Sequence, residues 1–251
     1  MTHISPARPG ESGSVIIWIF VCVAMFAALS FAVADMMRGG GTGKNEELVN
    51  VYASDIMSYS DNIRRAIQVM RVDGVSVSEL SFENSFISGY ENPRCNDPEC
   101  LVFNTAGGGV TYTIPDPKWL DITKDDEVYF NEWFVAADTC VPDVGTGDAT
   151  CAASDTTNED LTLFLTHIKR PICMEINKQL GIENPNNAPP QESGCPWSTA
   201  ATNRYTGSFI NGESIIAGTS FAGRQSGCFQ IGVCAGYDAD TYHYYQVLLP
   251  R

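Results

Sequence analysis

Residues 12–34 read SGSVIIWIFVCVAMFAALSFAVA, and this charge-free stretch decides how the chain is organised. As an α-helix with a rise of about 1.5 Å per residue, it would extend about 34 Å, which exceeds the roughly 30 Å hydrocarbon core of a bilayer. A surface helix of a globular domain has a polar face, and this stretch has none. We therefore predict a transmembrane helix over residues 14–38, preceded by a leader or cytoplasmic segment over residues 1–13.

The same stretch has a second interpretation as a cleaved secretory signal. Ala32-Val33-Ala34 has the small-residue pattern of a signal-peptide cleavage site. The apolar run is longer than the roughly 7–15 residues typical of a signal peptide, which favours a retained anchor. In both cases the chain after the stretch is expected outside the cytoplasm.

Cysteines support an oxidising location for that part of the chain. One of the nine, Cys22, lies inside the apolar stretch, and the other eight follow it. An even number of cysteines after an export segment predicts disulfides, and none of the spacings matches the C-x2-C knuckles of structural zinc sites. Sequence cannot choose among the pairings, and we take nearest neighbours as the working hypothesis: Cys95–Cys100, Cys140–Cys151, Cys173–Cys195 and Cys228–Cys234.

A glycine-rich break is expected at residues 39–43, GGGTG, before an extracytoplasmic domain over residues 44–251. The domain begins with an amphipathic helix, because apolar residues recur every three or four positions up to the Asp73-Gly74 stop signal. The stripe either packs on the domain's own sheet or serves as a helix assembly face. Its members are Val49, Tyr52, Ile56, Tyr59, Ile63, Ala66 and Met70.

Beyond this helix the pattern predicts short strands and one more helical region. The segments 75–82, 100–103 and 109–114 alternate like strands. Further strands are expected at 127–130, 132–137, 208–210, 213–218, 228–233 and 241–249. Helical spacing runs from about Glu159 to Leu180, with Pro171 as an expected kink. The predicted fold class is α+β: a transmembrane helix, then an amphipathic helix packed on a small antiparallel sheet in a disulfide-stapled head.

This order of a short leader, an uninterrupted apolar helix, an amphipathic continuation and a small disulfide-bonded head resembles type IV pilins and the pseudopilins of type II secretion. Gly10 and Gly13 are both possible leader ends, but neither places the family's usual glutamate at the fifth mature position. The resemblance implies a minor structural subunit of a bacterial envelope filament or secretion system. It implies that the apolar helix first sits in the inner membrane and then packs among pilin-like subunits, with the head periplasmic or at the cell surface.

Catalysis and cofactors are not predicted. No motif combines a nucleophile with a histidine base and an orienting aspartate. Acidic loop residues offer oxygen ligands for Ca²⁺, but without EF-hand spacing they support a metal only weakly; they include Asp143, Asp148, Asp155, Glu159 and Asp160. The net charge of −15, all of it carried after residue 38, argues against nucleic-acid binding. The alternative function is a membrane-tethered extracytoplasmic binding module that forms no filament.

Overall fold

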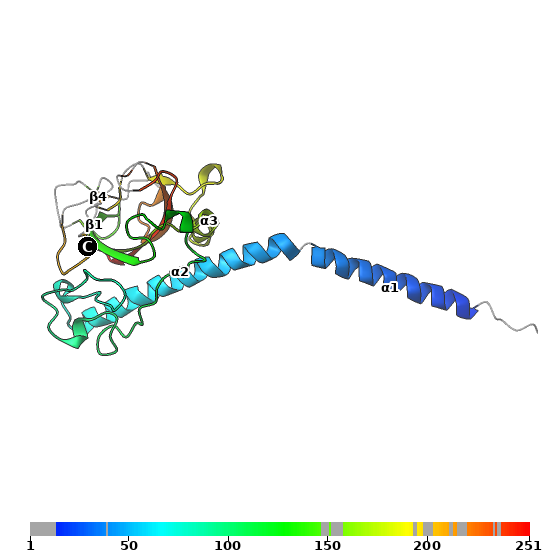
Figure 1. The fold of residues 1–251 in the computed structure, drawn as a ribbon, viewed down its shortest axis with the longest axis horizontal. Helices are drawn as coiled ribbons and strands as arrows, with labels where there is room; N and C mark the ends of the chain where they lie inside the picture. The colour runs from blue at the N-terminus through cyan, green and yellow to red at the C-terminus, as the bar shows by residue number, and fades with distance from the viewer. Residues whose placement is uncertain are drawn as a thin grey trace, which may run out of the picture. The chain divides into compact units, whose positions relative to one another are not determined.

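The computed structural model describes residues 14–38, 40–146, 151, 158–192, 195–197, 203–210, 213–214, 220–232, 234 and 237–251 (Figure 1). The chain forms two compact units, Met1–Leu48 and Val49–Arg251. The first contains α1 (Ser14–Arg38) and the start of α2 (Gly40–Val72). We call the second unit the head. The predicted leader, residues 1–13, lies outside the described residues.

The predicted transmembrane helix is corrected by the structure. Within the described part of the chain, no helix is both long enough and apolar enough to cross a membrane. The described side chains of α1 run from Ile16 to Phe31.

The predicted glycine-rich break also differs from the structure, because α2 begins at Gly40 and residues 40–43 are helical. Gly39 lies outside the described residues. A helix needs only backbone hydrogen bonds to continue, so glycines lower its stability, by about 1 kcal/mol each relative to alanine, without forbidding it.

Helix α2 ends where the sequence predicts. Gly74 has a φ of +100°, a left-handed conformation that glycine adopts without steric cost. The N–H of Gly74 donates to the carbonyl of Arg71, and the N–H of Val75 donates to the carbonyl of Met70. This pair of bonds is the Schellman motif, which satisfies carbonyls at the last turn of the helix.

One six-stranded sheet forms the centre of the head, in the order β3-β5-β6-β2-β1-β4. Its strands are β1 (Trp133–Cys140), β2 (Asp160–Leu165), β3 (Gln191–Glu192), β4 (Glu213–Ser214), β5 (Ser226–Ile231) and β6 (Tyr242–Leu249). The four inner strands pair antiparallel, whereas β3 and β4 join the edges in parallel. The sheet is therefore mixed, which corrects the predicted antiparallel sheet; the α+β class is correct.

Both faces of the sheet are buried. Alternate residues of one strand point to opposite faces, so Trp133 and Val135 join one apolar cluster while Phe134 and Ala136 join another. Helix α2 covers the first face (Figure 1). The second face is covered by side chains from the connecting segments, among them Trp197 and Phe221.

The remaining helices are short. They are α3 (Arg170–Gln179) and the 3-10 turns η1 (Val77–Glu79), η2 (Pro98–Cys100), η3 (Ile122–Lys124) and η4 (Pro185–Asn187). Pro171 lies in the first turn of α3, where its missing N–H is not needed, so it starts a helix instead of kinking a longer one. The three segments predicted as strands between residues 75 and 114 form turns and a single bridge, Ser81 to Leu101.

All eight predicted cysteines form disulfides, but two of the pairings differ from the nearest-neighbour hypothesis. The bonds are Cys95–Cys100, Cys140–Cys151, Cys173–Cys228 and Cys195–Cys234. The third bond joins α3 to β5. The side chain of Asn177, one turn further along α3, also binds both the N–H and the carbonyl of Cys228, so α3 satisfies part of the β5 edge that β3 leaves unpaired.

Candidate functional site

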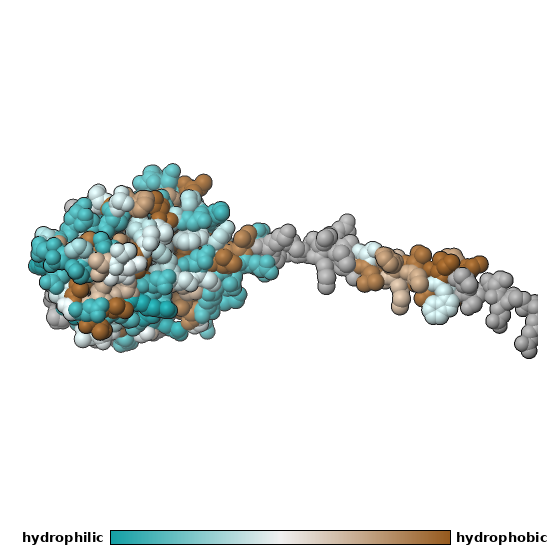
Figure 2. Space-filling view, turned by 90° about the horizontal axis from the view of Figure 1, so that it is seen from below, coloured by the Kyte–Doolittle hydropathy of each residue, from teal (hydrophilic) through white to brown (hydrophobic). Residues whose placement is uncertain are grey.

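Helix α1 presents an apolar surface on all sides. Every described side chain from Ile16 to Phe31 is exposed, with exposed fractions of 68% for Trp18, 70% for Phe20 and 76% for Phe26. Figure 2 shows this helix coloured largely as hydrophobic. Exposed apolar surface on this scale marks an interaction site, because single scattered residues account for the apolar surface of ordinary soluble domains.

Small residues interrupt the large ones along α1. Ala24 and Ala28 are one helical turn apart, and Cys22, the free cysteine of the chain, is exposed nearby. Small side chains at such spacing let two helix backbones approach closely, while the neighbouring aromatic rings supply contact area. The composition of α1 therefore suits packing against other helices.

The stripe that the sequence offered as an assembly face lies in the core of the head. Ile56, Ile63, Ala66 and Met70 are buried, and Val49, Tyr52 and Tyr59 are partly buried against the same cluster. Their partners include Trp133 of β1, whose ring centroid lies 4.8 Å from that of Tyr59. The structure thus brings these seven residues together against the sheet of their own domain.

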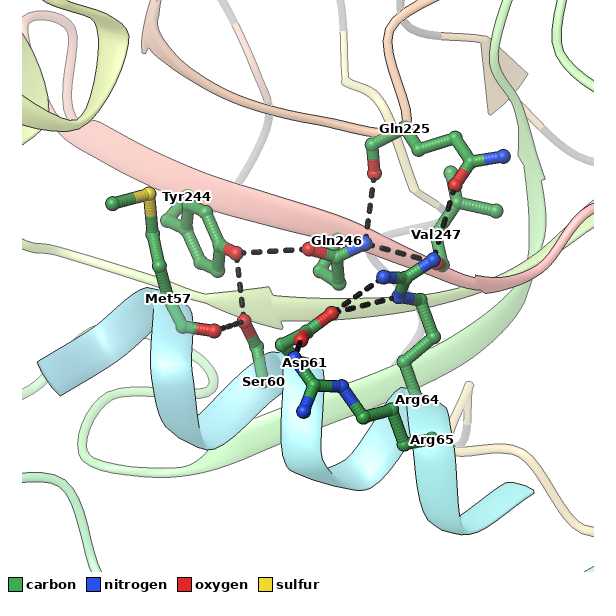
Figure 3. A network of polar contacts seen from close by, with 9 residues as sticks. All are labelled: Met57, Ser60, Asp61, Arg64, Arg65, Gln225, Tyr244, Gln246 and Val247. Atoms are coloured by element: carbon green, nitrogen blue, oxygen red, sulfur yellow. Dashed lines mark hydrogen bonds and ion pairs between the residues drawn. The ribbon is translucent and has the colours of Figure 1, made fainter. Parts of the chain in front are cut away.

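A polar groove lies between α2 and the sheet, and we call it the α2–β6 groove (Figure 3). It has a volume of about 640 Å³ and is formed by side chains of α2, of α3, of the residues leading into β5, and of β6. Its polar lining includes Ser58, Asp61, Arg65, Gln179, Gln225 and Gln246. Sequence reasoning missed this groove, since its walls come from four separate segments with no common motif.

Asp61 organises the charges of the groove. Its Oδ1 accepts from Nε and Nη2 of Arg64, at 3.0 and 2.5 Å, and its Oδ2 accepts from Nη2 of Arg65. Partial burial alone would raise the pKa of Asp61, but the hydrogen bonds and positive charges of the two arginines outweigh it and hold the pKa below its usual value. The carboxylate therefore stays ionised and fixes both guanidinium groups.

A second network supports the groove from beneath. The hydroxyl of Tyr244 lies 2.7 Å from Oγ of Ser60 and 3.2 Å from Oε1 of Gln246. The amide nitrogen of Gln246 donates to the carbonyls of Gln225 and Val247 (Figure 3). Helix and strand are thus joined by polar contacts at the floor of the groove, not only by apolar packing.

Two buried histidines form a separate polar cluster on the other side of the sheet. The ring centroids of His167 and His243 are 5.1 Å apart. Nε2 of His167 lies 2.8 Å from Oε2 of Glu127, and Nε2 of His243 lies 2.8 Å from Oγ1 of Thr241. Within the described residues the Nδ1 atom of each ring has no hydrogen-bond partner. Burial lowers the pKa of both imidazoles. In His167 the hydrogen bond and negative charge of Glu127 act in the opposite direction, but burial outweighs them.

The acidic loop residues do not assemble into a metal site where they are described. Asp160 is buried in β2, where its carboxylate accepts the N–H groups of Val141 and Arg251. Asp148 and Asp155 lie outside the described residues. In the described part of the chain, no group of three or more His, Cys, Asp or Glu side chains is placed to hold a metal ion.

Comparisons with known proteins add no relative: no protein-family model, no curated protein and no solved structure matches this chain. The function must therefore be argued from the residues themselves.

Proposed function

We propose that the chain is a non-catalytic, pilin-like structural subunit that assembles with copies of itself through α1. The observation that carries the proposal is the apolar surface of α1, which surrounds the helix and contains no charged side chain between Ile16 and Phe31. A helix that is apolar on all sides is stable when it is surrounded, and several parallel copies of the same helix would surround it.

The order of elements agrees with this proposal. The apolar helix α1 precedes α2 in the chain. The apolar stripe of α2 is buried inside the α+β head. The head therefore folds on its own core, and α1 is free to contribute to an assembly. A head that folds independently, with a separate helix for assembly, resembles the organisation of pilins and pseudopilins.

The disulfides support a location for the head. Four disulfide bonds form and persist in oxidising compartments, and they are rare in the cytoplasm. We propose that the head functions outside the cytoplasm, in the envelope or at the cell surface. Its surplus of acidic residues would keep neighbouring heads soluble and separate.

The experiment is sedimentation velocity of the full chain during stepwise removal of a mild detergent. We expect large, homogeneous particles for the natural chain, with electron micrographs showing ordered filaments. Phe26→Asn should raise the concentration needed for assembly about tenfold or more, because an interface that buries this ring gains about 1.5–3 kcal/mol.

Ile122→Asn is the matched control, since Ile122 is an exposed apolar residue of the head, at 65% exposure. It should assemble like the natural chain. A monomer that merely retains bound detergent, or a Phe26→Asn variant that assembles normally, would contradict the proposal. The monomer would favour the alternative function, a binding module that forms no filament.

A further inference from the structure

The α2–β6 groove has free hydrogen-bonding groups along its walls. Ser58 and Asn62 of α2 and Ser226 of β5 line it, and their side chains make no hydrogen bond to another described residue. Hydroxyls and primary amides both donate and accept. These side chains can form hydrogen bonds with a ligand that is rich in hydroxyl groups, because each hydroxyl of the ligand also donates one hydrogen bond and accepts others.

The groove also differs from the rest of the chain in charge. Its charged lining consists of Asp61, Arg64 and Arg65, a net charge of +1 in a chain of net charge −15. Asp61 engages only Nη2 of Arg65, so that the Nε and Nη1 donors of Arg65 have no partner among the described residues. A guanidinium with free donors binds a carboxylate through a charge-assisted hydrogen bond.

Part of the lining of the groove is held in place by contacts within the head. Arg64 is fixed by Asp61 and by a 3.4 Å contact from its Nη1 to Oε1 of Gln225. Tyr244 and Gln246 fix the floor (Figure 3). A fixed floor and a fixed Arg64 leave mainly the side chains of the groove walls to be ordered by a ligand.

We propose that the α2–β6 groove binds an acidic sugar, with its carboxylate on Arg65 and its ring hydroxyls on Ser58, Asn62, Gln225 and Ser226. The volume of about 640 Å³ lies within the usual range of ligand sites. The groove is open to solvent and Arg65 is largely exposed, with a side-chain exposure of 69%. Binding to one sugar unit should therefore be weak, with a dissociation constant on the order of 1 mM.

The test is saturation-transfer NMR on the full chain with galacturonate and galactose as probes, because this method observes the small ligand even when the protein is assembled. The two sugars differ only at C6, where galacturonate has a carboxylate and galactose has a neutral hydroxymethyl group. We expect galacturonate to receive saturation and to bind about fivefold more tightly than galactose, the effect of one exposed ion pair. Arg65→Gln should remove this preference while leaving the fold unchanged, as checked by the melting temperature.

Arg71→Gln is the matched control, since Arg71 lies on the same helix outside the groove. It should bind both sugars like the natural chain. Absence of saturation with both sugars, equal binding of the two, or an unchanged preference in Arg65→Gln would overturn the proposal. Competition with polygalacturonate then distinguishes two sources of the ligand. Displacement of galacturonate from the groove assigns the ligand to a polysaccharide, and absence of displacement assigns it to a free sugar. Both results must depend on Arg65.

Discussion

Helices α1 and α2 are both long, and both carry many apolar residues, yet they find their partners in different places. In α2 the apolar residues form one stripe, and that stripe is covered by the sheet of the same chain, with Ile56 and Ile63 fully buried. In α1 the apolar residues surround the helix, and each described side chain from Ile16 to Phe31 is exposed.

The difference shows that the fraction of the helix circumference that is apolar, more than the number of apolar residues, decides whether one chain can bury them. A narrow stripe fits one sheet face, whereas a fully apolar circumference needs neighbours on every side. We therefore propose that the head is stabilised from within and that α1 acts between copies of the chain.

The largest effect is expected from the disulfide that ties α3 to β5. Replacing Cys173 and Cys228 with alanine opens a link between residues 55 apart, and should lower the free energy of unfolding by about 4 kcal/mol. The matched pair is Cys95–Cys100, 5 residues apart, where the same change should cost about 2 kcal/mol. Urea unfolding measures both values. Equal losses would show that loop length does not govern the stability of the head.

The second prediction compares one isoleucine in each helix. Ile63→Ala in α2 should lower the free energy of unfolding by about 2–4 kcal/mol, because it leaves a cavity in the core. Ile19→Ala in α1, where the side chain is 57% exposed, should change it by less than about 0.5 kcal/mol and weaken only assembly. A large loss of head stability from Ile19→Ala would break the contrast between the helices.

The third prediction concerns acid. The pKa of His243 lies well below its usual value because the ring is fully buried, so the unfolded chain binds a proton near pH 6.5 that the folded chain rejects. The stability contributed by the neutral ring is complete above pH 6.5 and is lost as the pH falls toward the folded pKa, by up to about 2 kcal/mol at pH 5.

His243→Phe should flatten this acid loss, since a phenyl ring keeps the stacking on Phe229 and carries no proton. Urea unfolding at several pH values tests it. Assembly should not follow the same pH dependence, because the described surface of α1 between Ile16 and Phe31 has no ionisable side chain except the thiol of Cys22. A variant as acid-sensitive as the natural chain would assign the effect to another group.

The fourth prediction concerns an effect of opposite sign. Burial raises the pKa of Asp160 to about 7, although its two hydrogen bonds from backbone N–H groups lower the pKa. The folded chain therefore holds a proton that the unfolded chain releases near pH 4, and the stability from this group is complete below that pH and is lost as the pH rises through 7. In His243→Phe, this should appear as a decline in unfolding free energy from pH 5 to pH 8. A rise over that range would contradict the assignment.

Sequence reasoning succeeded where one local pattern determined the structure. It found α2 through its stripe and Gly74 stop, and it found strands near β1, β5 and β6 through their alternation. It failed for β2, because Asp160–Leu165 is buried on both faces and its leucines also match helical spacing. The transmembrane prediction was wrong for the described part of the chain, where no helix is both long enough and apolar enough to cross a membrane.

Long-range features could not be found from local patterns. The Cys173–Cys228 pairing depends on α3 lying against β5, which no spacing reveals. The α2–β6 groove joins Asp61 to Gln225 and Gln246, which lie more than a hundred residues later in the chain. Such sites become visible only when strand order and register are known.

The measurement that tests the central claim most directly is cross-linking through Cys22, which is the free cysteine and lies on the exposed surface of α1. A short bismaleimide should convert the assembled natural chain into covalent dimers, because α1 helices of neighbouring copies lie side by side. Cys22→Ala should give none, and Phe26→Asn should give few. Monomers alone, from assembled natural chain whose Cys22 has demonstrably reacted, would contradict the account and place the contacts between copies elsewhere.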